Sequence, residues 1–235
     1  MKAVILAGGR GKRLYPYTTK LPKPLVPIGK KPIIRVLIDQ LLKAGTSSIT
    51  LATGHLSYMI EEHFRQNNVG LEITFSKEEK RLGTAAPLKQ ITNLPKNFLV
   101  LNGDLLTDLD FRDLYEHHTK NKNMMTIATY EKKISVSLGV LELSGKEVVD
   151  YFEKPSYLYP VSMGIYVMER EVLDFIPENT FYDIPDLVKE LLSKQKKIGA
   201  YLFNGRWLDI GTNTDYQKAL ELFENEKEKF TISRD

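Results

Sequence analysis

Short apolar runs of strand length alternate with segments of helical periodicity through most of this 235-residue chain. The alternation is typical of a mostly parallel β-sheet covered by helices. The first run, Ala3 to Leu6, is continuous and is followed by Gly8-Gly9, which predicts a buried strand and a tight loop. We therefore predict an α/β fold.

The same patterns predict the order of the elements. Expected strands are 3–6, 49–53, 71–75, 98–101, 124–130, 161–168 and 198–203, and expected helices are 32–44, 58–65, 111–120, 184–192 and 213–229. Two strand-like runs flank Ser144-Gly145 and predict a hairpin, with mixed strand pairing in that part of the sheet. No repeat or linker divides the chain, so we expect one domain over residues 1–235.

Charge is distributed unevenly along the chain. Nine basic residues and no acidic one precede Asp39, although the net charge is only +3. Such a segment suits a nucleic-acid arm, a solvated face or the lining of a site for a small polyanion. Because the segment also carries ordered strand and helix patterns, the small anion is favoured over nucleic acid.

Composition excludes several classes of protein. No run approaches the roughly 18 apolar residues of a membrane span, and the first apolar run is too short for a signal peptide, so we expect a cytoplasmic protein without a membrane partner. The chain has no cysteine. Disulfides, a thiolate nucleophile and cysteine-based zinc sites are therefore excluded.

A glycine-rich loop follows the first strand. Glycines at Gly8, Gly9 and Gly11 let main-chain N–H groups approach a phosphate, although an ordinary tight turn has the same composition. The loop lacks the spacing of a P-loop and the third glycine of a dinucleotide motif. Four prolines between Pro16 and Pro27 exclude the long helix that follows the loop in both of those folds.

The stretch from Leu6 to Leu14, followed by Pro22-Lys-Pro24, resembles the opening of the sugar-1-phosphate nucleotidyltransferases. Further motifs occur in that family's order: Leu82-Gly-Thr-Ala85, Asn102-Gly-Asp104, Glu153-Lys-Pro155, Met163-Gly164 and Trp207-Leu-Asp-Ile-Gly-Thr212. The resemblance implies a Rossmann-like three-layer αβα sandwich with a predominantly parallel mixed sheet. It also implies synthesis of an NDP-sugar and pyrophosphate from a nucleoside triphosphate and a sugar 1-phosphate, with Mg²⁺.

The residues suit this chemistry. The attacking phosphate oxygen is already ionised near neutral pH, so catalysis needs cations and metal carboxylates rather than a protein nucleophile. Asp104 ends an apolar run, where a turn or helix-cap role is equally common, but together with Asp209 it resembles the family's Mg²⁺ pair.

The resemblance assigns roles to individual positions. The implied catalytic residues are Arg13, Lys23 and Asp104; the implied nucleotide contacts are Leu6, Ala7, Gly8, Gly9, Gly11, Arg13, Lys23, Glu78, Gly83, Thr84 and Asp104; the implied sugar-phosphate contacts are Glu153, Lys154 and Gly164; and the implied metal ligands are Asp104 and Asp209.

Base specificity is less constrained, because Arg81 and Ala86 depart from the family pattern beside the expected base pocket. Guanine offers two adjacent donors that one carboxylate can accept, and Glu78 stands where several guanylyl members have an acidic residue. We therefore expect GTP with a mannose- or heptose-type sugar 1-phosphate. The alternative is that 77–81 is a charged surface loop and main chain reads the base of UTP or dTTP.

Three other functions remain compatible with parts of the sequence. One is a catalytically silent NDP-sugar sensor, and another is a nucleic-acid binder that uses the basic segment. A third is a phosphocholine-type cytidylyltransferase with an aromatic acceptor site, for which the candidate residues are Tyr157, Tyr159, Tyr166 and Tyr182. The sequence does not decide the oligomeric state, and a homo-oligomer is compatible with it.

Overall fold

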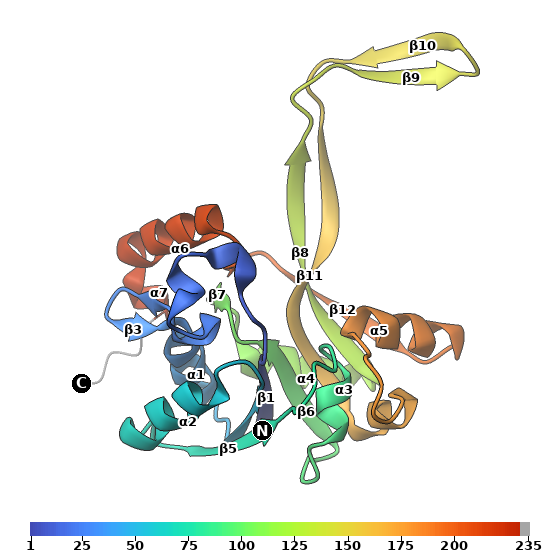
Figure 1. The fold of residues 1–235 in the computed structure, drawn as a ribbon. Coiled ribbons are helices and arrows are strands. Elements are labelled where there is room, and N and C mark those ends of the chain that lie inside the picture. The colour runs from blue at the N-terminus through green and yellow to red at the C-terminus, as the bar shows by residue number, and fades with distance from the viewer. Residues whose placement is uncertain (231–235) are drawn as a thin grey trace.

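A seven-stranded mixed sheet forms the centre of the computed structural model, which describes residues 1–230 (Figure 1). The strands are β1 (Lys2–Ala7), β2 (Pro27–Ile28), β3 (Lys31–Pro32), β4 (Ser48–Thr53), β5 (Glu72–Lys77), β6 (Asn97–Asn102), β7 (Leu105–Thr107), β8 (Met125–Ser135), β9 (Val140–Ser144), β10 (Glu147–Phe152), β11 (Ser156–Glu169), β12 (Ile198–Phe203) and β13 (Trp207–Asp209). The helices are α1 (Ile33–Lys43), α2 (Ser57–Gln66), α3 (Ala86–Lys89), α4 (Phe111–Asn121), α5 (Ile184–Ser193), α6 (Asn213–Asn225) and α7 (Lys227–Phe230).

The strand order in the main sheet is β12-β8-β11-β6-β1-β4-β5. Only β11 runs antiparallel to its neighbours, and the other pairs are parallel. The carboxyl ends of all the other strands therefore meet at one edge of the sheet. This arrangement confirms the predicted α/β fold and its predominantly parallel mixed sheet.

Two apolar cores lie on opposite faces of the sheet. In β1, Ile5 packs into the core under α1, α2 and α4, whereas Val4 packs into the core under α3 and α5. Leu99 and Phe98 of β6 divide in the same way. Central strands that are buried on both faces consist of consecutive apolar residues, and for this reason the sequence pattern predicted them. No helix within residues 1–230 has the length and apolar content to span a bilayer.

A third core lies beneath the segment that follows β1. Leu14, Val26 and Ile28 pack there with Tyr216 and Phe223 of α6. The chain from residue 12 to 25 forms three single 3₁₀ turns instead of a helix, as its prolines predict. This core fixes the basic segment against the C-terminal helices.

Most predicted elements are confirmed within two residues, and the differences come from tertiary contacts. The predicted helix over 213–229 is wrong near its end, because the chain breaks at Glu226 and Phe230 then packs on Phe223 at a ring distance of 6.1 Å. The short elements β2, β3, β7, β13 and α3 carry too little periodicity to be predicted. β8 and β11 are five residues longer at their shared end than predicted, because each pairs with the other beyond the sheet.

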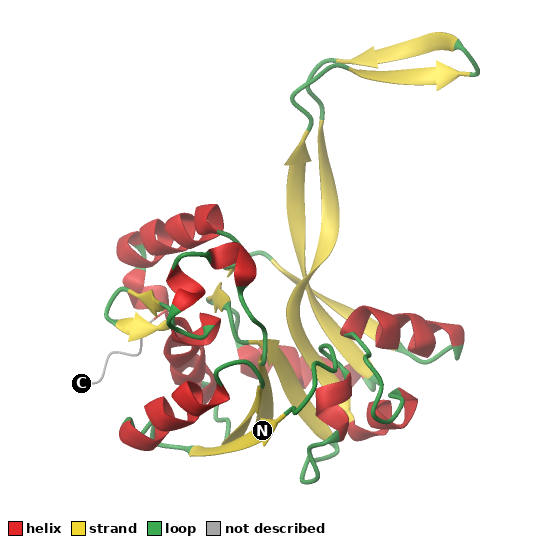
Figure 2. Cartoon of the chain, in the orientation of Figure 1, coloured by secondary structure: helices red, strands yellow, loops and turns green. Residues whose placement is uncertain are grey.

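Residues 131–161, which we call the arm, leave the body at this point (Figure 2). The outer halves of β8 and β11 form a two-stranded stem, and the β9–β10 hairpin forms its tip. The Ser144-Gly145 turn confirms the predicted hairpin. No residue of the arm is buried.

Candidate active site

The predicted nucleotide-binding residues meet at the carboxyl edge of the sheet. The glycine-rich loop follows β1, Glu78 follows β5 and Asp104 follows β6. The N–H of Gly103 donates to the carbonyl of Leu6 at 2.9 Å, which ties two of these strand ends together. Ligands of open α/β sheets bind at this edge.

The glycine-rich loop packs directly on the segment that carries Lys23. Gly11 has φ +60°, and the Thr18 hydroxyl donates to its carbonyl at 2.9 Å. A Cβ at Gly11 would lie 3.1 Å from the Cβ of Lys23, so a side chain here would be both strained and crowded. The ammonium of Lys23 forms an ion pair with the Asp104 carboxylate. The loop, the lysine and the carboxylate therefore form one structural unit.

Asp104 and Asp209 come together through the small β7–β13 sheet. Asp209 pairs with Leu105, and the Ile210 N–H donates to the Asp104 carbonyl at 3.0 Å. Asp209 keeps solvent access, but the protein around its carboxylate desolvates it, and this effect together with the nearby Asp104 charge raises its pKa. Lys23 and Arg13 oppose the increase. Two repelling carboxylates with cations beside them form a centre that takes up positive charge.

This pair fits a magnesium ion. Both side chains offer hard oxygen donors, and a bound cation would relieve the repulsion from Asp104 that adds to burial in raising the pKa of Asp209. Within residues 1–230, no group of three or more His, Asp or Glu side chains could hold a metal by itself. Substrate phosphate oxygens and water would complete the coordination shell, as is usual for Mg²⁺.

Glu78 lies against the glycine-rich loop. Its Oε1 is 2.6 Å from where a Cβ of Gly8 would lie and 2.7 Å from that of Gly54, so a side chain at either position would have to displace the carboxylate. Its Oε2 accepts the N–H of Leu82 at 3.1 Å. Burial raises the pKa of Glu78, while the Leu82 N–H and Arg81 act in the opposite direction. Glu78 is thus a half-buried acceptor beside the predicted phosphate loop.

Gly83 and Thr84 are held by the start of α5. Asp183 accepts both the N–H of Thr84, at 2.8 Å, and its hydroxyl, at 3.0 Å. Gly83 has φ +93°, and a Cβ there would lie 2.6 Å from the carbonyl of Tyr182. Both polar groups of Thr84 therefore position the segment, and their predicted contact with a nucleotide stays a prediction.

Gly164 lies at the same edge, beside Asn102. It has φ +72°, and a Cβ would lie 2.5 Å from the Asn102 amide nitrogen. Trp207 donates its indole N–H to the carbonyl of Met163 at 3.0 Å. The predicted sugar-contact glycine is thereby fixed between β6 and the strand that leads to Asp209.

Glu153 and Lys154 are not brought to this edge. Both lie exposed on the arm, where the Lys154 Nζ is 3.7 Å from the Glu153 Oε1. In the main sheet Ile165 pairs with Leu101, so the level of Asp104 corresponds to about Ser162 on β11. Six further register pairs end at Ser156, roughly 20 Å farther along the stem at about 3.3 Å per residue, and Lys154 lies beyond them.

The tyrosines considered for a cationic acceptor do not form one cage. Tyr157 and Tyr159 are exposed on the arm, with ring centroids 6.4 Å apart. Tyr166 is buried in the core under α5, and Tyr182 packs against the same core. This separation removes the one feature that favoured a phosphocholine-type acceptor.

Sequence reasoning missed several supporting residues. Asp183 and Asp215 begin α5 and α6 as parts of capping boxes, and a Ser, Thr or Asp followed three residues later by an acid is a signal that could have located both. Gly54, which packs on Glu78, has no local signal, and Asn102 lies in a family motif that does not reveal its packing on Gly164. Their roles depend on contacts between distant segments.

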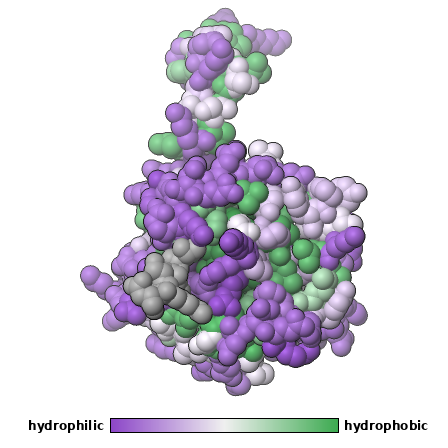
Figure 3. Space-filling view, turned by 90° about the vertical axis from the view of Figure 1, so that its left-hand side faces the viewer, coloured by the Kyte–Doolittle hydropathy of each residue, from purple (hydrophilic) through white to green (hydrophobic). Residues whose placement is uncertain are grey.

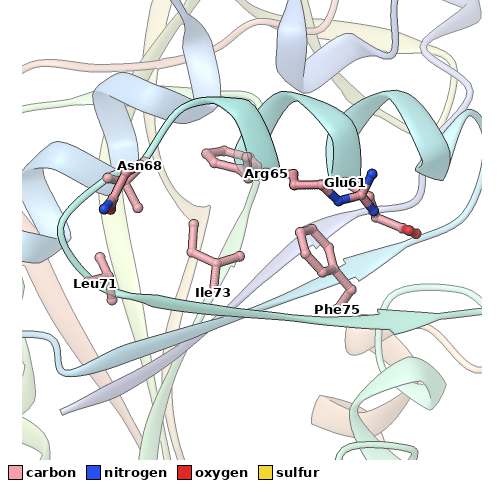
Figure 4. A pocket seen from close by; sticks show the side chains of 8 residues that line it. Glu61, Arg65, Asn68, Leu71, Ile73 and Phe75 are labelled. Atoms are coloured by element: carbon pink, nitrogen blue, oxygen red, sulfur yellow. The ribbon is translucent and has the colours of Figure 1, made fainter.

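A separate hollow of about 400 Å³ lies between α2 and the edge strand β5 (Figure 4). Leu71, Ile73 and Phe75 point from the strand toward the helix, where Glu61 and Arg65 border the hollow. None of the predicted site residues lines it. It has no connection with the carboxyl-edge site.

Comparison with known proteins agrees with this geometry. The family model described as nucleotidyl transferase matches residues 2–226. The D-glycero-α-D-manno-heptose 1-phosphate guanylyltransferase of Aneurinibacillus thermoaerophilus is 31% identical over 93% of this chain and 96% of its own length. The UTP–glucose-1-phosphate uridylyltransferase of Synechocystis sp. is 34% identical over 94% of this chain. This chain spans only 62% of that relative's length.

A solved structure shows the same architecture. The crystal structure of HddC from Yersinia pseudotuberculosis superposes with a TM-score of 0.76 and 26% identity, covering 94% of this chain and 99% of that chain. The family model spans the sheet, the glycine-rich loop and both carboxylates. The chain belongs to the sugar-1-phosphate nucleotidyltransferases of the nucleotidyl transferase family.

Proposed function

We propose that this chain transfers a nucleoside monophosphate from a nucleoside triphosphate to a sugar 1-phosphate and releases pyrophosphate. The observation that carries the proposal is the meeting of the glycine-rich loop, the Lys23–Asp104 ion pair and Asp209 at one sheet edge. This set provides anion-binding main chain, fixed cations and metal carboxylates. It matches a transfer that needs positioning and charge neutralisation and no protein nucleophile.

In this reaction an ionised oxygen of the sugar phosphate forms a bond to the α-phosphorus, and the bond from that phosphorus to the oxygen bridging to the β-phosphorus breaks. The electron pair leaves with pyrophosphate. Main-chain N–H groups around Gly9 and Gly11 would hold the triphosphate, and Arg13 and Lys23 would neutralise charge on the α-phosphate and the leaving group. No proton needs to be removed from the attacking oxygen.

Asp104 and Asp209 would hold Mg²⁺. When bound, the ion would neutralise triphosphate charge and orient the α-phosphate. Lys23 pairs with Asp104 and therefore lies beside the place where the triphosphate would bind.

For the nucleotide we propose GTP, with Glu78 as the residue that reads guanine. The ionised carboxylate would accept the adjacent N1–H and N2–H of the base, and the glycines at Gly8 and Gly54 leave room for the carboxylate itself. For the acceptor we propose a mannose- or heptose-type 1-phosphate. The guanylyl relative of nearly equal length supports this choice, while the uridylyl relative supports the alternative of UTP with glucose 1-phosphate.

The test is pyrophosphate release with Mg²⁺, crossing five nucleoside triphosphates with mannose, heptose, glucose and glucosamine 1-phosphates. Release that requires both GTP and a mannose- or heptose-type acceptor supports the full proposal. Release only with UTP or dTTP contradicts the base assignment and leaves the reaction class intact. Binding of nucleotide-sugars without any release would indicate the silent sensor instead.

A further inference from the structure

The arm carries a surface that a protomer alone leaves uncovered. Within the described residues, 11 of the 18 large hydrophobic side chains that are exposed lie in the arm. They are Ile134, Leu138, Leu141, Leu143, Val148, Val149, Tyr151, Phe152, Tyr157, Leu158 and Tyr159. Figure 3 shows the arm standing clear of the body with apolar side chains on its surface. An isolated two-stranded hairpin is at best marginally stable in water, so this surface requires a partner.

The tip of the arm has two chemically different faces. Leu143 pairs with Val148 and Leu141 with Tyr151, which places four apolar side chains, each at least half exposed, on one face of the hairpin. Residues 140–153 also contain four acidic residues and one basic residue. The tip is thus an amphipathic ribbon with a net negative charge.

The stem directs the tip away from its own site. The β8–β11 ladder ends at Ser156, roughly 20 Å past the level of Asp104, and Lys154 lies beyond it. Its base is anchored, because Trp207 donates to the Met163 carbonyl at 3.0 Å and packs on Tyr130 with ring centroids 5.5 Å apart. Lys154 therefore cannot reach the Asp104 edge of its own chain in this conformation.

The site, in turn, lacks what the arm carries. Two phosphate groups must meet for the transfer, and the proposed function assigns Arg13 and Lys23 to the triphosphate. The acceptor phosphate requires a further cation, and Lys154, which the family resemblance assigns to it, lies on the arm. The body also carries the N-terminal segment of nine basic residues with no acidic residue before Asp39. The acidic tip and this basic segment are complementary in charge.

A second copy of the chain satisfies all of these observations. It presents the same basic segment and the same incomplete site, and a two-fold arrangement lets each copy cover the arm of the other. If the 11 arm side chains of both copies each lost roughly 80 Å² of exposed area, the dimer would bury on the order of 1,800 Å², within the range of stable interfaces.

We propose that two copies exchange arms, so that Glu153 and Lys154 of the partner subunit complete the sugar-phosphate side of the Asp104 site. The catalytic half of this statement rests on the proposed function, whereas the docking of the arm does not. Each active site is then built from two chains. A monomer then has the nucleotide half of a site and Gly164, but lacks the cation for the acceptor phosphate.

The decisive experiment is complementation between two impaired variants, assayed with the sugar 1-phosphate well below its KM for the Lys154→Ala chain. Asp104→Asn and Lys154→Ala chains carry different affinity tags, are co-expressed, and are purified through both tags. In an arm-exchanged heterodimer one site receives both intact residues, so we expect about half of the wild-type specific activity. Activity no higher than that of the separate variants, or failure to recover any doubly tagged protein, overturns the proposal.

A second measurement does not depend on activity. The chain has no cysteine, so Lys154→Cys and Lys12→Cys chains each carry one thiol. Mixed and oxidised, they should form a disulfide-linked heterodimer, whereas a control mixture with Lys189→Cys on α5 should not. If wild type releases no pyrophosphate but this link forms, the proposed function fails and arm exchange stands. If neither the link nor a dimer in sedimentation is found, arm exchange fails regardless of catalysis.

Discussion

The body and the arm of this protein contrast within the same two strands. In β11, residues 163–168 are buried on both faces, whereas 156–160 of the same strand are exposed. The inner residues lie between β6 and β8 with helices on each side, but the outer ones have β8 as their one neighbour (Figure 1). One strand therefore belongs to a buried core in one half and to an uncovered ribbon in the other.

The contrast separates two kinds of functional residue. Those in the body, such as Asp104 and Glu78, are positioned by packing and hydrogen bonds within the chain. Those on the arm are exposed: Lys154 pairs with the neighbouring Glu153, which accepts the Tyr151 hydroxyl at 2.7 Å. Substitutions in the body should therefore change chemistry or folding directly, and substitutions in the arm should act through docking.

The largest effect is expected for Asp104→Asn in the body. Removing one metal carboxylate should lower kcat by about 10³-fold or more, because the charge of the triphosphate is no longer neutralised in the transition state. Pyrophosphate release measures the loss, and circular dichroism checks the fold. Asp174→Asn, an exposed residue outside the site, is the matched control. Undiminished turnover of D104N in Mg²⁺ would falsify the metal assignment.

Core substitutions should separate the two regions by stability. Leu99→Ala removes a fully buried side chain and should lower the free energy of unfolding by about 2–5 kcal/mol. Leu143→Ala in the arm should lower the free energy of unfolding of the monomer by less than about 0.5 kcal/mol, because the Leu143 side chain is exposed. Both losses are measured by urea unfolding at protein concentrations where sedimentation shows a monomer. Equal losses would show that the arm packs within its own chain.

Lys154→Ala should raise KM for the sugar 1-phosphate by about 10–100-fold, which corresponds to the loss of one charge-assisted hydrogen bond. KM for the nucleotide should stay nearly constant. Initial rates with one substrate varied at a time give both constants. Lys146→Ala, on the same hairpin, is the control for general loss of charge. An equal increase for both substrates would contradict a specific acceptor role.

Glu78→Gln should lower the preference for GTP over UTP by about 10-fold at pH 7, since a neutral amide accepts the guanine donors less strongly. Burial raises the pKa of Glu78 above 4.5, its ordinary value. The wild-type preference should therefore be lost as pH falls through this raised pKa, and be constant above it. The preference is measured as kcat/KM for GTP divided by kcat/KM for UTP. In this ratio the titration of the phosphates, which both nucleotides share, cancels. A variant with the wild-type pH profile would remove Glu78 from base reading.

Local periodicity was enough to predict most of the body. β1 and β6 are continuous apolar runs, and α1 and α5 have apolar residues at helical spacing. In each case the local sequence shows which residues are buried. The prolines after Leu14 likewise predicted the absence of a long helix. The break in the last helix was not predictable, because it depends on Phe230 finding Phe223 in a distant core.

By itself, the sequence determined the fold class, the motif order and the residue types that phosphoryl chemistry needs, because these follow from short-range spacing and side-chain chemistry. Only the tertiary structure decided which of those residues meet. It joined Asp209 to Asp104 through β7 and β13, placed Glu78 on Gly8, and carried Lys154 away on the arm. Strand pairing between distant segments sets these distances, and no local pattern records which strands will pair beyond the sheet.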